Sequence, residues 1–114
     1  MTDRTLVVFI TTPGRLASEK LALGLLRGKW AACVNRVPGL ISRYWWKGKI
    51  ETAREELLIV KTLSVKWSGL EKWVRSHHPY SVCEVLVLPA AAVSRPYLNW
   101  VRESLFPARR LKRK

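Results

Sequence analysis

Acidic residues and catalytic side chains are scarce in this chain of 114 residues. It has 8 acidic against 21 basic residues, two histidines, two cysteines and one aspartate, Asp3, near the N-terminus. The single aspartate excludes magnesium or protease chemistry built on paired aspartates. The sequence also lacks a Gly-x-Ser-x-Gly nucleophile motif and a glycine pattern that could bind phosphates. We therefore expect no enzymatic activity.

Long apolar segments are absent as well. No apolar run reaches about 18 residues, and the N-terminus lacks the charged and then apolar pattern of an export signal. These absences predict a cytoplasmic protein without a membrane span. Cys33 and Cys83 are far apart in the sequence, and we expect free buried thiols rather than a disulfide. The only acidic cluster, Glu51, Glu55 and Glu56, is expected at a solvated strand edge.

The net charge of +13 is unevenly distributed. Residues 107–114 are expected to form a disordered tail after a single domain at residues 1–106. Five residues of this tail are basic: Arg109, Arg110, Lys112, Arg113 and Lys114. The other basic residues are scattered, without the stripe that would fit a nucleic-acid groove, so we expect no specific nucleic-acid binding. Salt-sensitive binding of polyanions through the tail stays an alternative.

Hydrophobic periodicity predicts the order β-α-β-β-α-β with one further C-terminal helix. Strands are expected at residues 6–10, 31–46, 49–61 and 82–88, and helices at 16–27, at 66–77 and after Ser94. Pro38-Gly39 predicts a bulge in the second strand. Lys47-Gly48 predicts a tight hairpin turn. The order is that of an α+β ferredoxin-like sandwich, with an antiparallel sheet and helices on one face.

The predicted hairpin tip carries more aromatic surface than one subunit can cover. In an extended strand Tyr44 and Trp46 point to one face of the sheet and Trp45 points to the other. Exposed patches of this size mark interfaces, and long strand edges pair with neighbouring chains. We expect a closed homo-oligomer with cyclic symmetry. The residues expected at its interface or in an adjoining cleft are Tyr44, Trp45, Trp46, Lys47 and Tyr80.

His77 and His78 are adjacent, at the predicted end of a helix before Pro79. Imidazole suits copper and zinc, and Cys83 or Glu84 could add a ligand within the chain or across an interface. In a second interpretation His77 completes the apolar side of the helix and His78 caps its C-terminal carbonyls. Nonspecific chelation at the surface is a third. The residues leave all three open.

Four segments together resemble the CutA divalent-cation tolerance family. They are Ala32-Cys33-Val34-Asn35, the hairpin Tyr44 to Glu51, Ser76-His77-His78-Pro79-Tyr80 and Tyr97-Leu98-Asn99-Trp100. The resemblance extends from about Leu6 to Leu105. It implies a ferredoxin-like subunit related in fold to PII signalling proteins, a tight homotrimer formed by strand pairing between subunits, and a link to copper and other divalent metals. It implies no established reaction.

The chain departs from the family pattern where a metal site is concerned. Family members often have His-Pro-Tyr-Glu-Val-Pro-Glu, whereas residues 78–84 are His-Pro-Tyr-Ser-Val-Cys-Glu, with one carboxylate and one proline fewer and an added thiol. Ile10 occupies the position of a cysteine that some bacterial members are proposed to use for copper together with two histidines. Copper or another divalent cation is therefore expected to bind weakly, through His77 and His78.

Three functions follow from these observations. The favoured one is a trimeric divalent-metal binding and tolerance protein of CutA type. The first alternative is a PII-like trimeric signalling or interaction scaffold, which binds a ligand or protein at inter-subunit clefts lined by residues such as Arg36, Tyr44, Lys47 and Tyr80. The second alternative is polyanion binding through the basic tail.

Overall fold

The computed structural model describes residues 3–107. Its elements are β1 (Thr5–Thr12), α1 (Arg15–Arg27), β2 (Cys33–Trp46), β3 (Lys49–Leu63), the 3₁₀ turn η1 (Ser64–Lys66), α2 (Trp67–His77), β4 (Val85–Pro89) and α3 (Arg95–Leu105). The predicted α+β class and the ferredoxin-like order are confirmed. The basic residues of the predicted tail lie outside the described residues. No helix in the described part of the chain is long and apolar enough to cross a membrane.

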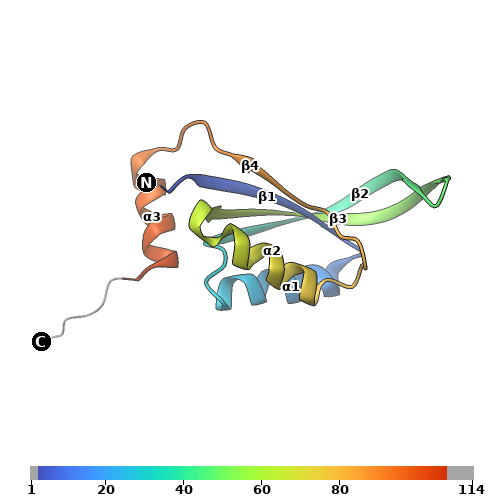
Figure 1. Cartoon of the computed structure of the whole chain (residues 1–114), viewed down its shortest axis with the longest axis horizontal. Helices are drawn as coiled ribbons and strands as arrows, with labels where there is room; N and C mark the ends of the chain where they lie inside the picture. The colour runs from blue at the N-terminus through green and yellow to red at the C-terminus, as the bar shows by residue number, and fades with distance from the viewer. Residues whose placement is uncertain (1–2, 108–114) are drawn as a thin grey trace, which may run out of the picture.

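The four strands form one antiparallel sheet in the order β2-β3-β1-β4. Every second residue of a strand points to the same face, and α1 and α2 cover one of the two faces (Figure 1). On that face Val8 of β1 and Val60 of β3 lie opposite each other and are fully buried. They pack with Leu21 and Leu25 of α1 and with Leu70 of α2 in the main core.

Two tryptophan rings pack between the helices, in space that glycines leave open. The ring of Trp30 lies against Gly28, after α1, and against Gly69 in α2. The ring of Trp73 in α2 lies against Gly24 in α1. A Cβ at Gly69 or Gly24 would overlap the neighbouring indole, so these glycines are required for the close approach of the helices.

The second face of the sheet is apolar and mostly bare. We call it the open sheet face; it consists of Val7, Phe9, Leu57, Ile59, Leu86 and Leu88, which strand alternation and register place together. Leu86 is 51% exposed and Leu88 is 45% exposed. Helix α3 covers only one end of this face, where Val101 and Leu105 pack on Leu63. The rest has no cover from the other elements among residues 3–107.

The β2–β3 hairpin extends beyond the helices and gives the molecule its elongated form (Figure 1). Its turn residues Lys47 and Gly48 have φ values of 51° and 79°, which is the two-residue turn that the sequence predicted. The predicted bulge is also confirmed, because the register shifts between Val37 and Leu40 and Gly39 has a φ of 85°. Trp45 near the tip is 72% exposed.

The start of the last strand differs from the prediction. The sequence placed a strand from residue 82, but β4 begins at Val85, where it pairs with Ile10. Cys83 and Glu84 therefore lie in the preceding loop. The reason is that His78 and Tyr80 hold this loop by hydrogen bonds of their own, which keep it off the ladder.

We expect Gly69→Ala to lower the free energy of unfolding by about 1–3 kcal/mol, because the added methyl group displaces the Trp30 ring. This loss should exceed the gain in helix propensity of up to about 1 kcal/mol. The measurement is denaturant unfolding at a fixed protein concentration. Lys72→Ala, at an exposed position of the same helix, is the control and should change stability by less than about 0.5 kcal/mol. A more stable Gly69→Ala variant would contradict the packing.

Candidate functional site

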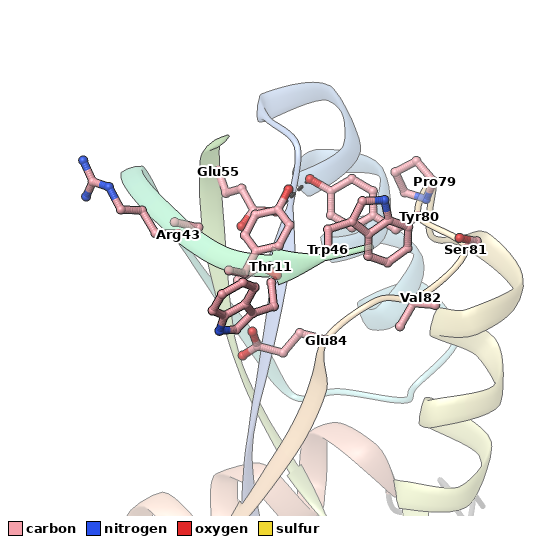
Figure 2. Close-up of a pocket in the computed structure, with 12 residues that line it drawn as sticks. Thr11, Arg43, Trp46, Glu55, Pro79, Tyr80, Ser81, Val82 and Glu84 are labelled. Carbon is pink, nitrogen blue, oxygen red and sulfur yellow. Dashed lines mark hydrogen bonds between the residues drawn. The ribbon is translucent and has the colours of Figure 1, made fainter. Parts of the chain in front are cut away.

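A hollow of about 820 Å³ lies between the β2–β3 hairpin and the loop that precedes β4 (Figure 2). We call it the hairpin hollow. Its lining residues are Thr11 of β1, Ser42, Arg43, Tyr44, Trp45 and Trp46 of β2, Glu55 of β3, and Pro79, Tyr80, Ser81, Val82 and Glu84 of the loop. The hairpin bends over one side while the loop closes the other, so the bulged hairpin and the loop anchor together position the site.

His78 anchors the loop. Only 8% of this residue is exposed. Its Nδ1 accepts a hydrogen bond of 3.0 Å from the backbone N–H of Tyr80, so the proton of the neutral ring is on Nε2. Nε2 then donates to the carbonyl of Thr11 at 2.8 Å. Both ring nitrogens are therefore engaged in holding the loop against the end of β1.

Tyr80 and Glu55 join the loop to the sheet inside the hollow. The Tyr80 hydroxyl donates a 2.7 Å hydrogen bond to Oε2 of Glu55 (Figure 2). Burial, followed by the hydrogen bond and the charge of Glu55, raises the pKa of the Tyr80 phenol well above its ordinary value, so it stays protonated and able to donate. Glu55 is only 8% exposed, and the expectation of a solvated edge is wrong for it.

A second carboxylate, Glu84, faces the same space from the loop. Partial desolvation, followed by the charge of Glu55, raises the pKa of Glu84 above its ordinary value. Arg43 is the only basic residue of the lining, and Figure 2 shows its guanidinium directed away from the other labelled side chains. Among the described residues, the charged groups that face the hollow are therefore the carboxylates of Glu55 and Glu84, although the whole chain carries a net charge of +13.

The residues predicted for a cleft are brought together only in part. Tyr44, Trp45, Trp46 and Tyr80 line the hairpin hollow. Lys47 is at the turn, with its ammonium 5.9 Å from the centre of the Trp46 ring, and does not line the hollow. Glu55 was not predicted as a site residue, because acidic residues on a strand are usually exposed to solvent. The aromatic residues of the paired strand β2 were the feature of the sequence that could have indicated its burial.

Arg36, also suggested for a cleft, lies on the other face of the sheet. Its guanidinium donates two hydrogen bonds to Glu56, at 2.6 and 2.7 Å. The hydrogen bonds from Arg36 lower the pKa of the Glu56 carboxyl. Glu56 is thus buried and paired rather than solvated, and the pair fixes β2 to β3 beside the bulge.

The two histidines do not act as a pair. His77 is exposed, and its Nδ1 donates to the carbonyl of Trp73 at 2.7 Å while its ring stacks on the Trp73 indole. The interpretation as packing residues is therefore reversed: His77, not His78, bonds a helix carbonyl, and His78 is the buried one. Nε2 of His77 keeps a lone pair, whereas His78 has none to offer in this arrangement.

The ligand set predicted for a metal does not converge within the described subunit. Residues 3–107 hold no group of three or more His, Cys, Asp or Glu that could bind a metal ion together. Burial raises the pKa of the Cys83 thiol, which disfavours the thiolate that metals require. The residues His77, His78, Cys83 and Glu84 thus do not fit a tight metal centre in this geometry, and their joint role stays a prediction.

Known proteins resemble this chain over nearly its whole length. Residues 6–104 match the family model of the CutA1 divalent ion tolerance protein. The protein CutA homolog of Xenopus laevis is 48% identical over 93 residues, which are 82% of this chain and 62% of that protein. The divalent-cation tolerance protein CutA of Thermus thermophilus is 43% identical over 98 residues, 86% of this chain and 95% of that protein.

Solved structures agree with these matches. The crystal structure of CutA1 from Oryza sativa has a TM-score of 0.86 and 42% identity, covering 89% of this chain and 93% of that one. The divalent cation tolerance protein from Thermus thermophilus has a TM-score of 0.85 and 42% identity, covering 88% and 97%. The chain spans less than two thirds of the Xenopus relative and of a rice relative, 62% and 56% of their lengths.

The Arg36–Glu56 pair predicts a pH-dependent stability. Because the folded-state pKa of Glu56 is lowered, its contribution is present above the unfolded-state pKa and is lost as the pH falls through the folded-state value. We expect Glu56→Gln to destabilise the protein at pH 7 and the difference from wild type to shrink below the ordinary pKa of 4.5.

Denaturant unfolding between about pH 7 and pH 3 measures this difference. In an Arg36→Gln background the same substitution should have a smaller effect at pH 7, since the partner is already gone. An effect that is constant across this pH range would contradict the pairing.

Proposed function

Because this chain belongs to the CutA1 divalent ion tolerance protein family, we propose that it acts in divalent-cation tolerance as a homotrimer. The observation that carries the proposal is the open sheet face, an apolar surface of six side chains that helices leave bare. Water contact with such a surface is costly, at about 25 cal/mol per Å² of apolar area. Association of identical copies removes that contact.

The hairpin supports association of the same kind. Strand β2 is an edge strand, and the hairpin extends past the rest of the sheet with Ile41 and Ile50 exposed by 52% and 64%. A long apolar edge pairs with another chain unless it is blocked. In a closed ring with cyclic symmetry every copy covers its exposed edge in the same way, and the family resemblance implies three copies. A cytoplasmic location stays a prediction, because relatives include proteins named chloroplastic and periplasmic.

Metal contact is proposed to be weak and to depend on one histidine. Nε2 of exposed His77 is the imidazole lone pair that the structure leaves free, and imidazole suits copper and other late divalent metals. One imidazole without a converging set of ligands gives a labile contact rather than a tight centre. We therefore propose that copper or another divalent cation binds at His77 and exchanges readily.

The scaffold alternative is favoured by a separate observation, the hairpin hollow. It is large enough for a small-molecule ligand and combines apolar walls with a few polar groups, which is typical of binding sites. It also opens beside the open sheet face, so a neighbouring subunit would lie close to it. A ligand-binding scaffold is compatible with a role in cation tolerance.

The trimer is tested by Leu86→Lys. Leu86 is 51% exposed in the subunit, so we expect the variant to fold but to dissociate, because the charge would be buried between copies. Light scattering should give about three times the chain mass of 13.1 kDa for wild type and a lower mass for the variant. Leu16→Lys, at a 78% exposed leucine on α1, is the matched control and should stay trimeric. A Leu86→Lys variant of unchanged mass would contradict the interface.

The metal contact is tested by copper(II) titration calorimetry on tagless protein. We expect weak binding that is lost in His77→Ala and retained in Cys83→Ser, because only His77 offers a free imidazole nitrogen. Loss of binding in Cys83→Ser would instead support a shared site of histidine and thiol. Wild-type and variant masses measured on the same samples separate loss of metal from loss of assembly.

A further inference from the structure

The hairpin hollow has a lining that attracts positive charge. Aromatic rings come from Tyr44, Trp45, Trp46 and Tyr80, and carboxylates come from Glu55 and Glu84. The face of an aromatic ring is electrically negative and attracts cations, most strongly for tryptophan. The carboxylates add full negative charges. Both kinds of group therefore favour the same sign of ligand.

Glu55 shows that the hollow is a built site and not only a surface depression. The residue is 8% exposed, and its Oε2 accepts the hydrogen bond from Tyr80. Its Oε1 has no hydrogen-bond partner among residues 3–107. This oxygen remains accessible to solvent, whereas the Thr5 hydroxyl is buried without a partner. A largely buried carboxylate with one protein donor takes its remaining contacts from water or from a cation that enters the hollow.

The lining also distinguishes between classes of cation. Calcium takes about six to eight oxygen ligands, and two carboxylates with one phenol do not supply them, while magnesium keeps its water ligands and gains little from aromatic walls. Strongly hydrated ions gain little from aromatic faces, whereas organic ammonium groups, which hold water weakly, gain most there. A hollow of about 820 Å³ has the size of sites for small organic molecules.

We propose that the hairpin hollow binds a small organic cation, with an alkylated ammonium group held between the rings and the carboxylates of Glu55 and Glu84. This inference rests on the ligand-binding scaffold alternative and names its ligand class. It does not depend on metal binding at His77, which lies outside the lining. Tyr80 acts as a positioning residue, because its hydroxyl holds Glu55 in place.

The test uses tetramethylammonium chloride as probe and tert-butanol as a neutral comparator of similar shape, at constant ionic strength. Two-dimensional NMR of the full chain follows the indole N–H signals of its six tryptophans. We expect saturable shifts of the Trp45 and Trp46 signals with tetramethylammonium and not with tert-butanol. Trp100 on α3, 45% exposed against 43% for Trp46, packs beside Tyr97 with tilted rings outside the hollow and is the internal control.

Variants then show which carboxylate attracts the cation. Glu55→Gln keeps the acceptor for Tyr80 but removes the charge, and we expect it to weaken tetramethylammonium binding roughly tenfold or more. Glu71→Gln, which removes a carboxylate on α2 that is paired with Arg75, should leave binding unchanged. Glu84→Gln, at an exposed position, should weaken binding less than Glu55→Gln does, and it decides the matter if Glu55→Gln does not fold.

The outcomes separate this inference from the scaffold proposal. Equal shifts with tetramethylammonium and tert-butanol would overturn the preference for a cation but would keep the hollow as a ligand site. No saturable shift with either probe, on protein whose oligomer mass is intact, would overturn both. Equal shifts at Trp100 and Trp46 would show that the probe binds any exposed indole ring rather than the hollow. This result would also overturn the inference.

Discussion

The loop before β4 is held to the end of β1 by one buried side chain, and most of the site depends on it. His78 accepts from the Tyr80 N–H and donates to the Thr11 carbonyl, so it connects two segments far apart in the sequence. Because the loop is fixed there, β4 starts late and Tyr80 reaches Glu55. The same two hydrogen bonds use both imidazole nitrogens. A histidine that looks like a metal ligand in the sequence thus has a structural role.

The sheet imposes the second constraint, because it is apolar on both faces and the helices cover one. Strand β1 illustrates this: Val8 and Ile10 are fully buried under the helices, while Val7 and Phe9, which alternate with them, face outward. The hairpin hollow opens beside that outward face. In the proposed trimer, the subunit interface and the ligand site would therefore lie side by side. Ligand binding would then change the association equilibrium of the subunits, and association would change the affinity for the ligand.

The sequence predicted the fold well because its signals are local. Lys47-Gly48 and Pro38-Gly39 are backbone constraints that act within a few residues, and both features lie where they were expected. The start of β4 and the burial of Glu55 could not be predicted, since each depends on a partner distant in the chain. His77 and His78 show the same limit: adjacent in sequence, they point to different neighbours, Trp73 and Thr11.

The strongly basic composition does not oppose a cation site, because the effect of a charge inside the hollow depends on its distance and on its burial. Charges on the surface are screened over about 8 Å at physiological ionic strength, so lysines and arginines farther than this from the hollow contribute little inside it, whereas the Lys47 ammonium lies 5.9 Å from the centre of the Trp46 ring. Glu55, a residue that is only 8% exposed, is screened far less, and it lines that space. With Arg43 directed outward, the groups of the lining that attract a cation are Glu55, Glu84 and the aromatic rings. A net charge of +13 and a site selective for cations are therefore compatible in one small domain.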